Sequence, residues 1–330
     1  MAVSVEARPL LIPGLLVAGA LITSLLPEGW RRTRLLVAAV ASALTLAVVA
    51  NLAALTSTGP VTGSLGEAVP GVSLSLRADQ LGLALVVAVV IATLLALAAT
   101  EPRSAHEGAI LLTAAGAAVA ALAGNAVVLF GGLELANLGG LLLNRAARGR
   151  VSRGSLAVFA IQHAFGLGLL TAAVLLIVAT GTSDPYALPP SAFGLAVAIP
   201  WGLAGVSRLL APAWWPGTAA GNDAAWLSVG AIPCGGAVLL RLVAGLDGAA
   251  EPELIGLLGA IGVAAALGGG MMAWRWQREP RRAGRALLVG AAGPVVALAV
   301  VPGGTGAFSA GLLALELAVL AAPAWSQGVG

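Results

Sequence analysis

The sequence predicts an all-α, polytopic membrane protein of about eleven transmembrane helices, and three observations support this. Apolar residues make up 59% of the chain and charged residues only 9%, whereas a soluble domain carries about 25% charged residues. A soluble fold of this length buries only about three quarters of its surface, which cannot hide so much apolar area. The apolar runs are also about twenty residues long and lack the alternation of a membrane β-barrel.

The predicted spans follow one another along the chain and form a single transmembrane domain over residues 1–330. The first begins just after Arg8; we interpret it as a span rather than a signal peptide because it is long and no clear cleavage site follows. Several spans are rich in Gly and Ala, which lets helices approach closely in lipid. The expected ranges are 9–26, 35–56, 79–99, 107–122, 124–143, 155–180, 191–211, 224–246, 254–274, 284–302 and 306–323.

The placement of arginine predicts the orientation of the chain. Every basic side chain is arginine, and none is lysine. Three clusters follow the first, fifth and ninth spans and so lie on one side of the membrane, while the opposite loops are acidic. By the positive-inside rule we expect a bacterial inner-membrane protein with its N-terminus outside and its C-terminus cytoplasmic. The clusters are Arg31, Arg32 and Arg34; Arg145, Arg148, Arg150 and Arg153; and Arg275, Arg278, Arg281, Arg282 and Arg285.

Several kinds of chemistry are excluded or disfavoured. Cys234 is the only cysteine, so the chain has no intramolecular disulfide and no cysteine-based metal site. No phosphate-binding glycine loop, nucleophile elbow or metal-ligand spacing occurs, so we expect no metal and no cofactor, and an intramembrane enzyme is the least favoured function. The net charge of +3 comes from the arginine clusters between spans, so no nucleic-acid partner is expected.

The seventh span is predicted to be broken or kinked. Pro200 lies within it and Pro212 ends it, followed by Trp214, Trp215 and Pro216. Proline removes a backbone donor and kinks or breaks a helix, and a broken helix at membrane depth often marks a transport site. The alternative is a simple kink followed by aromatic residues that anchor the helix at the interface.

Carboxyl groups inside the membrane are the strongest functional candidates. Glu134 lies in the middle of the fifth span, and Asn137 lies three residues later on the same helix face. Glu316 has a similar position in the last span. An intramembrane charge costs about 2.5–3.5 kcal/mol, so such groups face the bundle interior. Each could carry a proton, or could be a neutral or arginine-paired group that holds helices together.

Basic and polar side chains in three other spans could complete a polar path. Arg208 lies one short turn before Pro212, and Arg241 lies near the outer end of the eighth span, where the simpler expectation is that it snorkels to the interface. Gln162 and His163 lie in the sixth span. A lone histidine in such a position is more often an interhelical hydrogen bonder than a proton relay.

Five segments, in this order, resemble the antiporter-like subunits shared by respiratory complex I, membrane-bound hydrogenases and multisubunit cation/proton antiporters. They match the family's Leu-x-x-Asp-x-Leu entry to the third span, its Phe-x-x-x-Glu-Leu segment, the end of its sixth span, its broken helix with Pro-x-His-x-Trp-x-Pro, and its Asp-x-Lys-Arg loop. The segments are Leu76–Leu81, Leu129–Leu135, Ala179–Thr182, Pro212–Pro216 and Glu279–Arg282 with Gly293.

The resemblance implies proton transfer along a polar axis at mid-membrane, from a glutamate on the fifth span to a lysine in the broken seventh span and onward. It assigns the first role to Glu134 and makes Arg208 the nearest candidate for the second. Arginine cannot lose its proton as lysine does, and the eighth span offers only Cys234 as a titratable group. The exit half of the path is also missing unless Glu316 substitutes for it.

The sequence therefore leads to two hypotheses of different class. The first is a shortened, diverged membrane subunit of a complex I-like or hydrogenase-like assembly, which either conducts protons through Glu134 or has become mainly structural. Its partners would be other membrane subunits and the lipid bilayer. The alternative is a stand-alone secondary transporter for a small solute, although the arginine-rich loops indicate no inverted repeat of the kind common in such transporters.

Overall fold

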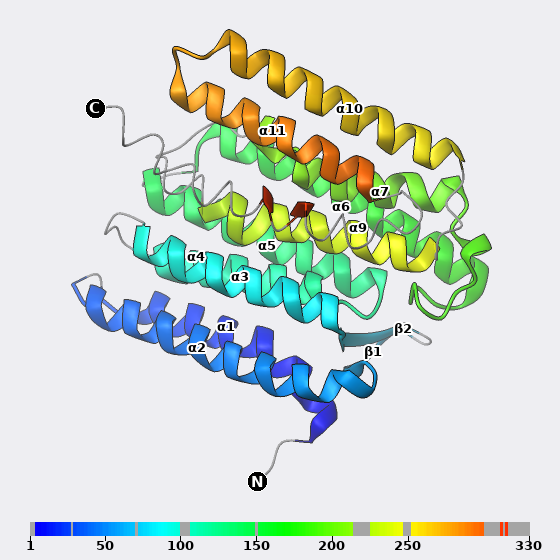
Figure 1. The fold of residues 1–330 in the computed structure, drawn as a ribbon. Helices are drawn as coiled ribbons and strands as arrows, with labels where there is room; N and C mark the ends of the chain where they lie inside the picture. Colours follow the sequence, from blue (N-terminus) through cyan, green and yellow to red (C-terminus); the bar gives the residue numbers. More distant parts are fainter. Residues whose placement is uncertain are drawn as a thin grey trace.

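The computed structural model describes residues 4–27, 29–69, 72–99, 106–148, 151–213, 225–246, 252–299, 311–312 and 314–315. This part of the chain is mostly helical. Its helices pack side by side, with α1 and α2 at one edge, α10 and α11 at the opposite edge, and α5, α6, α7 and α9 between them (Figure 1). The helices are α1 Arg8–Leu25, α2 Arg31–Leu55, α3 Gln80–Ala99, α4 His106–Ala121, α5 Ala126–Arg148, α6 Arg153–Thr180, α7 Leu195–Leu209, α9 Ile232–Leu246, α10 Pro252–Arg275 and α11 Pro280–Leu298.

Length and composition make several of these helices capable of crossing a membrane. Within the described ranges, seven segments qualify: those containing α1, α2, α3, α5, α6, α9 and α10. α4 and α7 are shorter apolar helices. A multi-pass membrane protein is thus confirmed, whereas the predicted number of eleven spans is not, and most of the last predicted span, 306–323, lies outside the described residues.

Small residues let neighbouring helices pack closely, as the composition predicts. Gly116 of α4 lies directly against Ala136 of α5, and Gly132 of α5 lies against Ala120 of α4. α10 and α11 meet in the same way through further glycines, including Gly262. Close backbone approach maximises van der Waals contact where the solvent is itself apolar.

The all-α prediction missed a β-hairpin at one end of the bundle (Figure 1). Strands β1 (Val61–Val69) and β2 (Val72–Ala78) pair antiparallel, from Val61 opposite Ala78 to Val69 opposite Val72. Apolar and polar residues alternate over β2, a pattern typical of a half-buried strand. β2 also bonds to the α4–α5 turn, where the Gly124 amide donates to the Ser75 carbonyl over 2.9 Å. The hairpin thereby fixes the start of α3.

The predicted break in the seventh span is not confirmed. α7 continues through Pro200, ends at Leu209, and is followed by a 3-10 turn over Ala211–Ala213 that contains Pro212. Trp214 and the residues up to 224 lie outside the described part of the chain.

A distortion does occur in the eighth predicted span, where the π-helical segment Leu227–Ala231 precedes α9 and the Ile232 amide donates to the Leu227 carbonyl. Pro233, the next residue, cannot donate to the helix and its ring crowds the preceding turn, so we attribute the wider turn to it.

Candidate functional site

The two polar residues of α5 and α6 that were singled out from the sequence lie in contact. The Nδ1 atom of His163 is 2.7 Å from Oε2 of Glu134, and the Asn137 side-chain amide donates to Oε1 over 3.2 Å. Gly166 provides the room, since a Cβ atom there would lie 2.7 Å from the Glu134 Oε1 atom. The sequence placed Glu134 and Asn137 on one helix face, but it did not reveal that His163 is the partner.

The Glu134–His163 pair is not sealed inside the bundle. The His163 side chain is 43% exposed and that of Glu134 is 22% exposed. The His163 ring stacks on Phe159, with ring centroids 6.0 Å apart, and exposed apolar side chains such as Leu167 surround it on the same face of α6. The pair therefore reaches the lateral surface of the described bundle.

Arg208 is buried but is held by backbone rather than by a carboxylate. Its side chain, on the last turn of α7, donates to the Ala204 carbonyl over 3.0 Å and to the Gln162 carbonyl over 3.5 Å. Gln162 donates in turn to the Ser207 carbonyl. No ion pair joins Arg208 to an acidic side chain of the described ranges. Arg208 thus ties α7 to α6 near Glu134 without contacting it.

A small cavity lies beside Asn137, with residues of α5 and α6 in its walls. Its volume is about 10 Å³, enough for a water molecule, and its walls include Asn137, Asn144, Ser155 and Gln162. The Oε1 atom of Gln162 is buried and has no hydrogen-bond partner among the described residues. Ser155 donates to Asn144 over 2.9 Å. Polar groups therefore extend from Glu134 toward the arginine-rich loop between α5 and α6.

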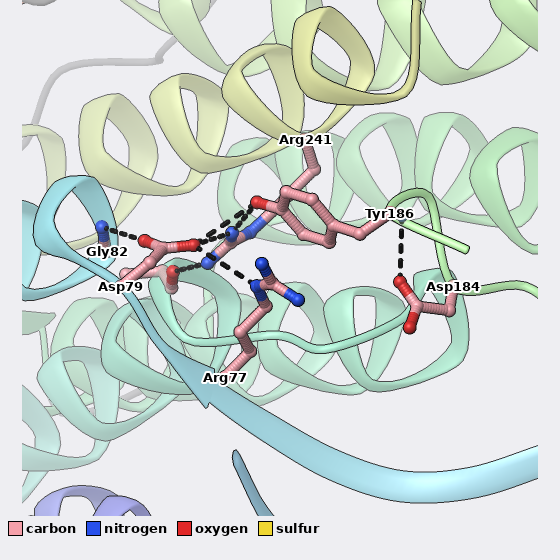
Figure 2. Close-up of polar contacts among 7 residues, drawn as sticks. Arg77, Asp79, Gly82, Asp184, Tyr186 and Arg241 are labelled. Atoms are coloured by element: carbon pink, nitrogen blue, oxygen red, sulfur yellow. Dashed lines mark hydrogen bonds and ion pairs between the residues drawn. The ribbon is translucent and has the colours of Figure 1, made fainter. Parts of the chain in front are cut away.

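A second polar cluster closes the hairpin end of the bundle (Figure 2). Arg241 of α9 donates to Asp79 Oδ2 over 2.6 Å, to the Ala121 carbonyl over 2.5 Å and to the Tyr186 hydroxyl. The Gly82 amide donates to Asp79 Oδ1 over 2.7 Å. The cluster joins α9, the start of α3, the end of α4 and the loop after α6.

Arg77 adds a second positive charge to this cluster, and burial shifts the pKa of Tyr186 within it. The Arg77 guanidinium lies 3.9 Å from the centre of the Tyr186 ring and 3.8 Å from Asp79. Burial raises the pKa of Tyr186 above 10.0; Arg241 opposes this and Asp79 reinforces it. The expectation that Arg241 snorkels to the interface is wrong, because its side chain is only 5% exposed and is paired with Asp79.

The structure thus groups the predicted site residues only in part. Glu134 and His163 meet, Arg208 lies near them, and Glu316 falls outside the described residues. Pro200 and Pro212 contribute no break that is visible in the described chain. Sequence reasoning missed Tyr186, the only tyrosine, and used Asp79 only as part of a motif. No local pattern links these two residues, because their contact depends on the fold.

Comparison with known proteins finds similarity in structure alone. No family model and no curated protein matches the sequence. A chain of the archaeal membrane-bound sulfane sulfur reductase matches with a TM-score of 0.79 and 18% identity over 99% of this chain. A chain of the Mrp complex from Dietzia sp. DQ12-45-1b matches with a TM-score of 0.76 and 21% identity over 95% of this chain. A chain of respiratory complex I from Thermus thermophilus matches with a TM-score of 0.71 and 19% identity over 98% of this chain.

The matching chains are longer than this one. The present chain covers 57% of the sulfane sulfur reductase chain, 36% of the Mrp chain and 72% of the complex I chain. At these identities the likeness establishes the fold. The resemblance inferred from the sequence is therefore confirmed at the level of the fold, which this chain shares with the matching chains of these three complexes.

Proposed function

We propose that this chain is a membrane subunit of a complex I-like or hydrogenase-like proton- or cation-translocating assembly, with an interrupted proton path and a mainly structural role. The observation that carries the subunit role is the lateral exposure of the Glu134–His163 pair. The fold shared with chains of three multisubunit membrane complexes supports the same conclusion. We place the protein in a bacterial inner membrane with its N-terminus outside, on the arginine distribution alone.

A polar pair on the lateral surface needs a cover. A charged group facing the bilayer centre costs about 2.5–3.5 kcal/mol, so such groups face protein or water. The described chain supplies Asn137 and His163 to Glu134, yet 43% of the His163 side chain stays exposed. Another protein packed on this face of α6 would cover the pair and separate it from lipid. A subunit interface provides that packing.

The interruption of the proton path rests on residue chemistry and geometry together. A relay needs groups that gain and lose a proton, and arginine stays charged at any physiological pH. Arg208 is the arginine of α7, it is buried, and its side chain donates to two carbonyl oxygens. Arg241 of α9 forms an ion pair with Asp79 in the other polar cluster. Protons that reach Glu134 through the Gln162 cavity would have no titratable acceptor on α7.

Site-specific crosslinking in the native membrane tests the subunit role. A photoreactive residue replaces Leu167, which lies one turn from His163 on the same face of α6 and leaves the Glu134 contact intact. The matched control replaces Leu267, an exposed apolar residue of α10. We expect position 167 to crosslink to one membrane protein that also copurifies in mild detergent. A stable, partner-free protein with no protein crosslink at position 167 would contradict the proposal.

A further inference from the structure

A lateral groove opens between α1, α4 and α5, and none of its lining residues makes the contacts described above for Glu134 or Asp79. Its volume is about 470 Å³, within the range of roughly 300–1,000 Å³ typical of ligand pockets. Apolar side chains form most of its walls, and Arg145 lies at its edge. The residues that matter here are Val17, Leu21, Gly108, Leu112, Leu142 and Arg145.

The groove follows from the residues of α4. This helix is almost entirely buried behind its neighbours, and its first turns carry Gly108 and Ala109, which lack bulk. Gly108 and Ala109 present little side-chain volume to the space between α1 and α5, so α4 leaves this space unfilled. Leu21 of α1 and Leu142 of α5 line the groove together with these two residues.

The charge at one end defines which part of the bilayer the groove meets. Ser24 lies at the end of α1, Gly108 at the start of α4 and Arg145 in the last turn of α5. These ends all border arginine-rich or connecting loops that the positive-inside rule places in the cytoplasm. Arg145 is exposed and has no hydrogen-bond or ion-pair partner among the described residues. An unpaired cation thus stands at the headgroup level of the inner leaflet.

We propose that the groove binds one anionic phospholipid of the inner leaflet, with an acyl chain along α4 and the phosphate against Arg145. The guanidinium fork matches phosphate geometry, and basic pockets between helices on the cytoplasmic side favour acidic headgroups. Along α1 the groove runs from Val17 to Ser24, which is about 10 Å at 1.5 Å per residue. That length takes the upper part of one acyl chain.

The charge at the edge of the groove favours a lipid over a helix of a neighbouring subunit. The cation at the edge matches an acidic headgroup and has no use for an apolar helix.

Native mass spectrometry of the purified 330-residue protein tests the proposal. The protein is released from micelles that contain equal amounts of phosphatidylglycerol and phosphatidylcholine, and the retained lipids are counted. Arg145→Gln removes the cation and Val17→Trp fills the inner end of the groove. Arg153→Gln is the matched control, because this exposed arginine carries the same charge on the same side of the membrane but does not line the groove.

The expected result is one tightly retained phosphatidylglycerol in the wild-type protein and in Arg153→Gln. Arg145→Gln should weaken the preference for phosphatidylglycerol about fivefold, the effect of losing roughly 1 kcal/mol per basic residue near an anionic surface. Val17→Trp should lose lipids of both kinds. Equal retention in Arg145→Gln and Arg153→Gln, or displacement of the bound mass by inorganic phosphate, would overturn the proposal. A retained membrane protein that excludes lipid from this face would do the same.

Discussion

Removing one partner of the Asp79–Arg241 pair should destabilise the protein unequally, depending on which partner is removed. Breaking a buried pair costs roughly 3–5 kcal/mol, because the remaining charge is left without compensation. Asp79→Asn removes the carboxylate from the Arg241 side chain, which is only 5% exposed. The guanidinium stays charged because arginine does not lose its proton at any physiological pH. We therefore expect a loss of about 5 kcal/mol in the free energy of unfolding, the upper end of that range.

The opposite substitution should be milder. Arg241→Met leaves Asp79 22% exposed, still bound by the Gly82 amide and close to the Tyr186 hydroxyl. Its charge is thus partly solvated and partly compensated, and we expect a loss of about 3 kcal/mol. The double variant should recover about 2 kcal/mol relative to Asp79→Asn alone, since the buried, unpaired Arg241 guanidinium is gone and the remaining Arg77 is partly exposed.

Thermal unfolding of the purified protein in detergent, monitored by the helical circular dichroism signal, ranks the stability of these variants. Apparent midpoints must be compared at one heating rate, because unfolding of such proteins is often irreversible. Arg282→Met is the matched control: it breaks an exposed pair with Glu279 at 3.0 Å, which is worth only about 0–1 kcal/mol. An Arg241→Met protein as stable as this control would refute the pairing, and a reversed order of Asp79→Asn and Arg241→Met would refute the solvation argument.

Two further results are expected from the same geometry. Because Tyr186 is the only tyrosine, ultraviolet titration reports it alone, and its midpoint should lie above 10.0, since burial raises its pKa. The stability that this neutral phenol contributes should be complete below pH ~10 and lost as pH rises through the higher folded-state value; a midpoint at or below 10.0 would contradict the burial argument. In α6, Gly166→Ala should cost about 1–3 kcal/mol by overpacking against Glu134. Gly168→Ala, whose nearest neighbour would be 3.6 Å away, should be neutral or slightly stabilising, so equal effects would count against the close packing.

The positions of most helices could be read from the sequence because lipid leaves few choices. Backbone groups must be satisfied within each apolar run, so a run of sufficient length becomes a helix. The ranges expected for the fifth and sixth spans, for example, overlap α5 and α6 closely. The hairpin escaped notice because it lies between two strong spans, and its short strands give a much weaker signal than a span does.

The pairing of side chains could not be read in the same way. Arg241 was expected to reach the interface because a long cation near a helix end usually does. Its true partner, Asp79, is 162 positions away in the chain, and only the packing of α9 against α3 brings them together. Glu134 and His163 were each recognised as unusual within lipid, but their contact depends on how α5 and α6 rotate about their axes. Periodicity does not fix that rotation.

If the proposed function is right, Glu134 does not carry protons across the membrane. Coupled proton translocation by the intact assembly in membrane vesicles, compared between the wild type and Glu134→Gln, tests it most directly. Copurification of the variant with its partners at the wild-type level shows that assembly is preserved. We predict an unchanged ratio of protons translocated to substrate turned over. A lower ratio in a fully assembled Glu134→Gln complex would contradict the claim and assign conduction to this chain.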